Sequence, residues 1–185
     1  MKIIRLRDGK ERSLQRRHPW IFDSAIAKGG ADAGETVRVE SHAGQFLAWA
    51  AFSPASKIRA RVWSFDEAQR IDAAFLTGVV HKAVLARSRM AIASDGVRLI
   101  HGESDGLPGL VVDRYGDTLV AQFLSTGAER FKAVITLEAG ANPIVVVAKD
   151  RSANTAKDSI NVTTILKDRD GNSLKFGRMP DGRMW

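Results

Sequence analysis

Residues 58–65, IRARVWSF, alternate apolar and polar side chains and predict a strand that presents Arg59 and Arg61 on one face. Two shorter stretches precede this strand. Thr36–Glu40, TVRVE, alternates in the same way, whereas Phe46–Phe52, FLAWAAF, is a nearly continuous apolar run typical of a strand buried on both sides. Short strands at such close spacing predict a small β-barrel in the N-terminal part of the chain.

The hydrophobic period changes after this region. Apolar residues recur at helical spacing over residues 71–92, with Asp72 as the expected N-cap and residues 94–96, SDG, as the expected stop. The apolar runs at residues 110–115 and 118–123 flank a Gly-Asp turn and predict a β-hairpin. The expected fold class is therefore α+β, with a barrel followed by a helix-containing α/β segment.

The charge of the chain is distributed unevenly. Residues 1–93 carry 16 Lys and Arg against nine Asp and Glu, whereas residues 94–185 carry 12 of each. The whole net charge of +7 thus belongs to the first half. A protein that neutralises phosphates releases condensed counterions, so this clustering favours a nucleic-acid partner over a merely solvated face. The basic stretch lacks the wide apolar helical face that binding to an anionic membrane needs.

The composition excludes several classes of function. The chain has no cysteine, which excludes a disulfide framework, a thiolate zinc site and a cysteine nucleophile, and we expect no metal site. The N-terminus lacks the apolar segment of a signal peptide, and no apolar run approaches the roughly 20 residues that span a bilayer. We therefore expect a soluble, cytoplasmic protein.

A first group of candidate binding residues lies before and within the stretch at residues 12–22, RSLQRRHPWIF. Arginine forks suit phosphate oxygens, and aromatic planes suit unstacked bases. The alternative is that the aromatic end of this stretch belongs to the core, which we expect for Ile21 or Phe22 and which stays open for Trp20. The candidate RNA-binding residues of this group are Lys10, Arg12, Arg16, Arg17, His18 and Trp20.

A second group lies at residues 52–61, FSPASKIRAR, where a rigid loop precedes the strand with alternate arginines. Hydroxyl and guanidinium donors in this arrangement suit a ribose-phosphate backbone. The alternative is an ordinary loop followed by a solvent-facing strand. The candidate RNA-binding residues of this group are Ser53, Ser56, Lys57, Arg59 and Arg61.

A third group, at residues 101–110, HGESDGLPGL, has the composition of an active-site loop. Adjacent residues rarely converge on one reacting atom, and members of a catalytic triad normally come from separate parts of a chain. The pairs Asp105-Gly106 and Pro108-Gly109 favour turns. We therefore interpret this stretch as structural and expect no catalytic residue in it.

Three motifs together resemble those of the ribosomal RNA large subunit methyltransferase I family, which consists of S-adenosylmethionine-dependent RNA cytosine-5 methyltransferases. They are residues 16–22 (RRHPWIF), 53–61 (SPASKIRAR) and 102–117 (GESDGLPGLVVDRYGD). The resemblance extends over about residues 6–134. It implies an N-terminal PUA domain, a small barrel that docks structured RNA, and a middle α/β segment that connects this barrel to a catalytic domain.

The sequence departs from the family pattern after residue 134. The resemblance implies a Rossmann-like domain with a glycine-rich cofactor loop and a catalytic cysteine, but no strand, glycine-rich turn and helix follow in order, and no cysteine is present. We expect S-adenosylmethionine for the full-length family but no catalytic or cofactor-binding residue in this chain. A truncated or recombined gene product is the expected origin.

Residues 135–185 have a β-rich pattern, with strands expected at residues 135–150 and 159–166. This tail is similar to the last strands of a bacterial immunoglobulin-like domain. The expected organisation is thus a PUA-like barrel at residues 1–70, an α/β connecting segment at residues 71–134 and the tail.

Three functions remain open. The first is an RNA-binding module, with ribosomal RNA as partner, that performs no catalysis. The second is a methyltransferase that needs a missing domain or a partner. The third is a protein-interaction module that associates with itself or with another protein through the exposed β edges of the tail.

Overall fold

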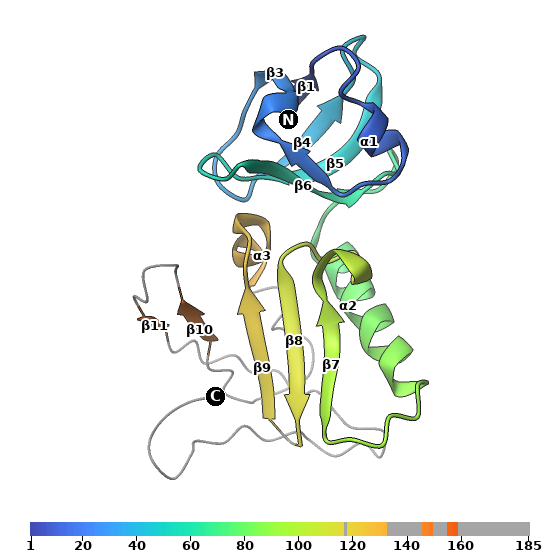
Figure 1. Cartoon of the computed structure of the whole chain (residues 1–185), viewed down its shortest axis with the longest axis vertical. Coiled ribbons are helices and arrows are strands. Elements are labelled where there is room, and N and C mark those ends of the chain that lie inside the picture. The colour runs from blue at the N-terminus through green and yellow to red at the C-terminus, as the bar shows by residue number, and fades with distance from the viewer. Residues whose placement is uncertain (117, 133–145, 150–154, 159–185) are drawn as a thin grey trace.

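The computed structural model describes residues 1–116, 118–132, 146–149 and 155–158. A barrel of short strands stands at one end of the molecule, and a second sheet with a helix against it stands at the other (Figure 1). Strands predominate over helices in the described part of the chain as a whole. The predicted α+β class is confirmed.

Residues 2–64 form a six-stranded sheet in the order β2-β6-β5-β4-β1-β3. β1 and β4 are parallel, and the other neighbours are antiparallel. The strands are β1 (Lys2–Leu6), β2 (Trp20–Phe22), β3 (Ile26–Gly29), β4 (Thr36–Glu40), β5 (Phe46–Phe52) and β6 (Ile58–Ser64). The sheet surrounds a core formed by Ile4, Leu6, Leu14, Ile21, Val37, Val39, Ala48, Ala50, Phe52, Ala60 and Val62.

The outer face of β5 differs from the prediction. The apolar run of β5 predicts burial on both sides, but Phe46, Leu47 and Trp49 are half-buried. The guanidinium carbon of Arg38 lies 4.8 Å from the ring centre of Phe46 and 5.9 Å from that of Trp49. An arginine on the neighbouring strand, rather than a second layer of structure, therefore covers these aromatic rings.

The second sheet consists of β7 (Gly96–His101), β8 (Leu110–Tyr115) and β9 (Thr118–Phe123), and the predicted hairpin of β8 and β9 is confirmed. The helix α2 (Ala73–Ser88) packs against this sheet (Figure 1). Short helices follow two of the strands: η2 (Gly102–Asp105) after β7 and α3 (Thr126–Arg130) after β9.

One end of α2 follows the prediction and the other does not. The carboxylate of Asp72 accepts a hydrogen bond of 3.0 Å from the amide of Phe75, which confirms the predicted N-cap. The helix ends at Ser88 rather than near Ile92, and Ala91 has a φ of +43°. Met90 and Ile92 are exposed, so no packing surface supports further helical turns there.

The tail is described only in part. β10 (Val146–Lys149) and β11 (Thr155–Asp158) pair antiparallel. β10 lies within the strand region expected at residues 135–150, whereas the strand expected at residues 159–166 lies outside the described residues. No helix in the described part of the chain is long and apolar enough to cross a membrane.

A close packing contact joins the barrel to the second sheet. Ala51 of β5 and Trp63 of β6 belong to the core of the second sheet, although they stand on barrel strands. Gly127 of α3 fits against both, because a Cβ atom there would overlap the Cβ of Ala51 and lie 2.9 Å from Cζ2 of Trp63. Beside this contact, the hydroxyl groups of Ser53 and Thr126 are hydrogen-bonded at 2.6 Å.

Replacing Gly127 by Ala should destabilise the chain by about 1–3 kcal/mol, because the added methyl group overfills a packed contact. The change in the free energy of unfolding would be measured by urea denaturation. Gly78→Ala is the matched control, since Gly78 lies in α2 with no heavy atom within 4 Å of an added Cβ. The control should stabilise by about 0.5–1 kcal/mol. Equal effects of the two substitutions would contradict the packing contact.

Candidate nucleic-acid interface

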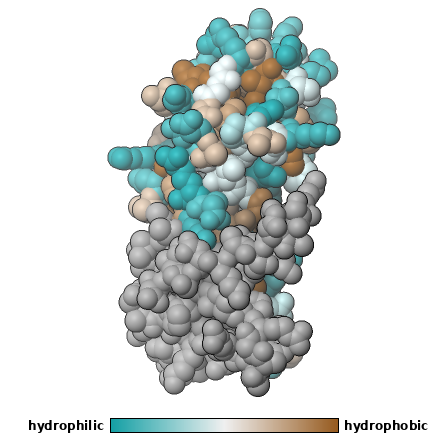
Figure 2. Space-filling model, turned by 90° about the vertical axis from the view of Figure 1, so that its left-hand side faces the viewer, coloured by the Kyte–Doolittle hydropathy of each residue, from teal (hydrophilic) through white to brown (hydrophobic). Residues whose placement is uncertain are grey.

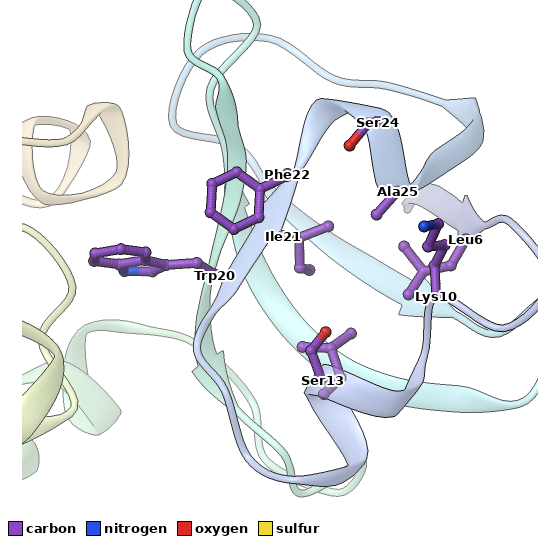
Figure 3. A pocket seen from close by; sticks show the side chains of 9 residues that line it. Leu6, Lys10, Ser13, Trp20, Ile21, Phe22, Ser24 and Ala25 are labelled. Carbon is purple, nitrogen blue, oxygen red and sulfur yellow. The ribbon is translucent and has the colours of Figure 1, made fainter.

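An outer face of β2 carries two exposed aromatic rings. Trp20 is 37% exposed and Phe22 is 46% exposed, whereas Ile21 between them is buried. Figure 3 shows Trp20 and Phe22 pointing to one side of the strand and Ile21 to the other. Side chains alternate along a strand, so one buried residue in the middle presents both neighbours on the opposite face. The exposed pair forms an aromatic surface at the edge of the barrel sheet.

The adjacent strand β6 adds two arginines to this surface. Trp20 is paired in register with Arg61, and the buried pair Ile21 and Ala60 faces the core. Arg59 and Arg61 therefore share the outer face with Trp20, as the alternation in the sequence predicts. We call Trp20, Phe22, Arg59 and Arg61 the aromatic–arginine face. Planar rings and guanidinium groups side by side are suited to single-stranded nucleic acid, because bases stack on the rings and phosphates bind the cations.

Both arginines of this face form ion pairs with carboxylates. Arg59 Nη2 lies 2.7 Å from a carboxylate oxygen of Asp23, and Arg61 Nε lies 3.6 Å from Oε1 of Glu103. The same Oε1 accepts a hydrogen bond of 2.7 Å from the indole nitrogen of Trp20. Glu103 belongs to η2 of the second sheet, so this carboxylate connects the aromatic–arginine face to the other half of the molecule.

Four cations stand in and around α1 (Arg12–Gln15), next to β2. Lys10, Arg12 and Arg16 are exposed, and their side chains have no ion pair or hydrogen bond among the described residues. Arg17 lies with its guanidinium carbon 4.8 Å from the ring centre of Phe65. Cations without acidic partners keep their full charge for an external anion, which makes this group the strongest candidate for phosphate contacts.

Arg17 also occupies an unusual backbone position. Its amide donates to the carbonyl of Leu14 at 2.8 Å, and the amide of His18 donates to the carbonyl of Ser13 at 3.0 Å. These two bonds form the Schellman motif that ends α1, and the residue at this position needs a left-handed conformation. Arg17 adopts it with a φ of +61°, where glycine is the usual residue. The turn directs the chain from the cations into β2.

The remaining predicted residues occupy several environments. Ser53 is buried, with its hydroxyl bonded to Thr126, so its side chain serves the contact between the two halves. Ser56 accepts a hydrogen bond of 3.2 Å from the amide of Ile58 and shapes the loop before β6. Lys57 in the same loop is exposed.

His18 accepts a hydrogen bond from the amide of Trp20, and its ring lies edge-on to the indole with centres 5.8 Å apart.

Two other arginines of the barrel, Arg5 and Arg38, are engaged in internal pairs. Arg5 and Arg38 both donate to Glu40, at 2.7 Å and 3.2 Å. The hydrogen bond from Arg5 is the main cause that lowers the pKa of Glu40, and burial opposes it. A hydrogen bond to Glu67 is the main cause that raises the pKa of Arg38. These pairs neutralise Arg5 and Arg38, whereas Lys2, Arg7 and Lys28 are exposed on the barrel with no ion pair among the described residues.

The stretch at residues 101–110 contains the turns that its sequence predicts. Gly106 and Gly109 have φ values of +72° and +76°, which turns require, and a strand rather than a helix follows them. Asp105 accepts two hydrogen bonds of 2.6 Å from Arg87, which ties η2 to α2. Among the described residues, no group of three or more acidic or histidine side chains could hold a metal ion.

Two residues of the site were not predicted. The apolar character of the segment allows either Ile21 or Phe22 in the core, although the alternation of β2 permits only one of them to be buried. The strict period of two around Ile21 was the signal that could have identified Phe22. The residues around Glu103 predict a turn, and no local sequence pattern indicates that Glu103 reaches a tryptophan 83 positions away.

Comparisons with known proteins give one match to the barrel alone and others to a longer part of the chain. A PUA-like domain family matches residues 4–65. Ribosomal RNA large subunit methyltransferase I of Citrobacter koseri is 52% identical over 134 residues, and that of Escherichia coli strain UTI89 is 50% identical over 134 residues. Each match covers 70% of this chain and 34% of the relative. The chain thus spans about a third of the length of the curated relatives it matches.

Solved structures share the fold at lower identity. A protein described as a SAM-dependent methyltransferase from Streptococcus mutans has a TM-score of 0.68 and 17% identity, covering 85% of this chain and 43% of that protein. A methyltransferase crystallised in complex with SAH has a TM-score of 0.67 and 16% identity, covering 85% and 42%. At these identities the likeness concerns the arrangement of the strands and helices.

Replacing Glu103 by Ala should speed the exchange of the Trp20 indole hydrogen with solvent by about tenfold, because a hydrogen bond to a charged acceptor is lost. The exchange rate of the indole resonance would be measured by NMR. The control variant is Glu67→Ala. The indole of Trp49 donates to the backbone carbonyl of Glu67, so this variant removes a carboxylate but retains the hydrogen bond of the indole. If Trp20 exchanged no faster in Glu103→Ala than in Glu67→Ala, the proposed link would be absent.

Proposed function

We propose, from the premise that about 70% of this chain is homologous to the ribosomal RNA large subunit methyltransferase I family, that the chain docks ribosomal RNA through its barrel. The observation that carries the proposal is the position of the aromatic–arginine face beside the α1 cations. The two surfaces meet at β2, which follows α1 after a short turn. One continuous region therefore offers both phosphate partners and stacking partners for RNA.

The order of contacts follows from the charges. The exposed side chains of Lys10, Arg12 and Arg16 exert the longest-range attraction and bind phosphates without breaking an internal ion pair. Arg59 and Arg61 act later, because a phosphate must first compete with Asp23 and Glu103 for them. This competition costs free energy and makes contacts at β6 selective for RNA that already fits the aromatic rings.

The chain supplies binding rather than chemistry in this proposal. The family resemblance implies a cysteine thiolate that attacks the cytosine ring, and this chain has no cysteine. The stretch with three glycines at residues 102–109 leads into β8, whereas a cofactor loop of the Rossmann type leads into a helix. We therefore propose that the chain positions RNA and that S-adenosylmethionine serves the complete methyltransferases of the family.

Replacing Arg12 and Arg16 together by Glu should weaken binding to ribosomal RNA and reduce the slope of log affinity against log salt by about two units, one for each lost phosphate contact. Filter binding across a salt series would measure both quantities. The control pair is Lys82→Glu with Arg89→Glu, which changes net charge equally at exposed positions on and just after α2. Equal losses in both double variants would mean that net charge, and not a site at α1, drives binding.

A further inference from the structure

The ring of Trp20 is restrained by contacts from both halves of the molecule. Its indole nitrogen donates a hydrogen bond of 2.7 Å to Oε1 of Glu103 in η2. On the barrel side, Nδ1 of His18 accepts a hydrogen bond of 3.2 Å from the amide of Trp20, and the His18 ring lies edge-on to the indole. Trp20 is nevertheless 37% exposed, so a restrained ring keeps part of its surface open.

The segment that carries Glu103 is itself held in place. Asp105 accepts a hydrogen bond of 2.6 Å from each terminal nitrogen of Arg87 in α2, and another of 2.6 Å from the amide of His101. The side chains of Arg87 and Asp105 are only 17% and 10% exposed. Glu103 therefore stands on a well-supported piece of backbone, and its carboxylate has a defined position relative to the second sheet.

The contact between Trp20 and Glu103 forms only when the two halves are docked. The two residues are 83 positions apart, one on the barrel and the other beside the second sheet. The packing of Gly127 against Ala51 and Trp63 sets the distance between these halves. The orientation of an exposed ring on the barrel thus depends on a residue that lies outside the barrel.

This contact reduces the cost of stacking on the ring. A side chain that must be ordered when a partner binds lowers the affinity, because rotamer entropy is lost. A hydrogen bond to a charged acceptor orders the indole beforehand. The same Oε1 lies 3.6 Å from Nε of Arg61, which is paired in register with Trp20, so the carboxylate also keeps a guanidinium group beside the ring.

We propose that Glu103 is a positioning residue, which holds the Trp20 ring in the orientation that stacks on RNA, so that the second sheet completes the RNA-binding face of the barrel. The inference rests on the proposed RNA-binding function and deepens it. Glu103 acts through Trp20 and not through contact with RNA. A carboxylate that merely repelled phosphates would have the opposite effect, because its removal would strengthen binding.

The experiment compares two RNAs with the same number of phosphates: a hairpin with a single-stranded loop and a fully paired duplex. Glu103→Ala should weaken binding to the hairpin about fivefold, because the ring must then be ordered during binding. Binding to the duplex should not weaken, since its bases are stacked on each other and do not use the ring. The slope of log affinity against log salt for the hairpin should stay the same, because no phosphate contact is lost.

Three further variants identify the route of the effect. Glu103→Gln retains an oxygen that accepts from the indole, and it should bind the hairpin within about twofold of the wild type. Glu67→Ala is the matched control, because it removes a carboxylate that pairs with Arg38 and retains the hydrogen bond of the Trp49 indole. It should not weaken binding to the hairpin. In a Trp20→Ala background, Glu103→Ala should cause no further loss, since the ring through which it acts is absent.

The outcomes separate this inference from the function on which it rests. If the wild-type chain binds the hairpin with a steep salt dependence and Glu103→Ala binds it equally or more tightly, Glu103 positions nothing and the RNA-binding function stands. An equal loss on hairpin and duplex, or a loss that persists in the Trp20→Ala background, also overturns the positioning role. Failure of the wild-type chain to bind either RNA overturns both.

Trp20→Phe decides the matter even if Glu103→Ala does not fold. This variant retains an aromatic ring but lacks the N–H group that Glu103 accepts from. It should lose affinity for the hairpin and not for the duplex, and a Trp20→Phe variant that binds the hairpin as tightly as the wild type would overturn the inference.

Discussion

The packing of Gly127 against Ala51 and Trp63 determines how the barrel sits on the second sheet. The close approach leaves no room for a side chain, so the two halves share one layer of core contacts. The ring of Trp63 also lies edge-on to Phe131, with centres 5.8 Å apart. A contact that tolerates so little change fixes the orientation of the halves, because packed interiors resist gradual deformation. That orientation brings Glu103 within reach of Trp20 and Arg61.

The edge strand β2 organises the proposed interface because its two faces have different partners. One face presents Trp20 and Phe22 beside the arginines of β6, and the other contributes Ile21 to the core of the barrel. The α1 cations precede the strand, and in the proposed function they attract phosphates to it. On the side of the barrel opposite to α1, hydrophilic residues prevail as well, with small separate hydrophobic areas among them (Figure 2).

Local patterns in the sequence predicted most of the fold and part of the site. The alternation in Thr36–Glu40 and the apolar run in Phe46–Phe52 gave strands with the observed bounds, and Asp72 is the predicted N-cap, because these features depend on neighbours along the chain. The burial of Ser53 and the contact of Glu103 with Trp20 were beyond prediction. Both depend on residues more than 70 positions away, which no periodicity reveals.

Ultraviolet cross-linking of the chain to ribosomal RNA fragments, followed by mass spectrometry of the peptides that carry nucleotides, tests the central claim most directly. The account predicts cross-links on the segments at residues 10–22 and 56–61, with Trp20 and Phe22 foremost, since aromatic rings stacked on bases react efficiently only at close contact. Cross-links concentrated on α2 or on the second sheet, with none on these two segments, would contradict it.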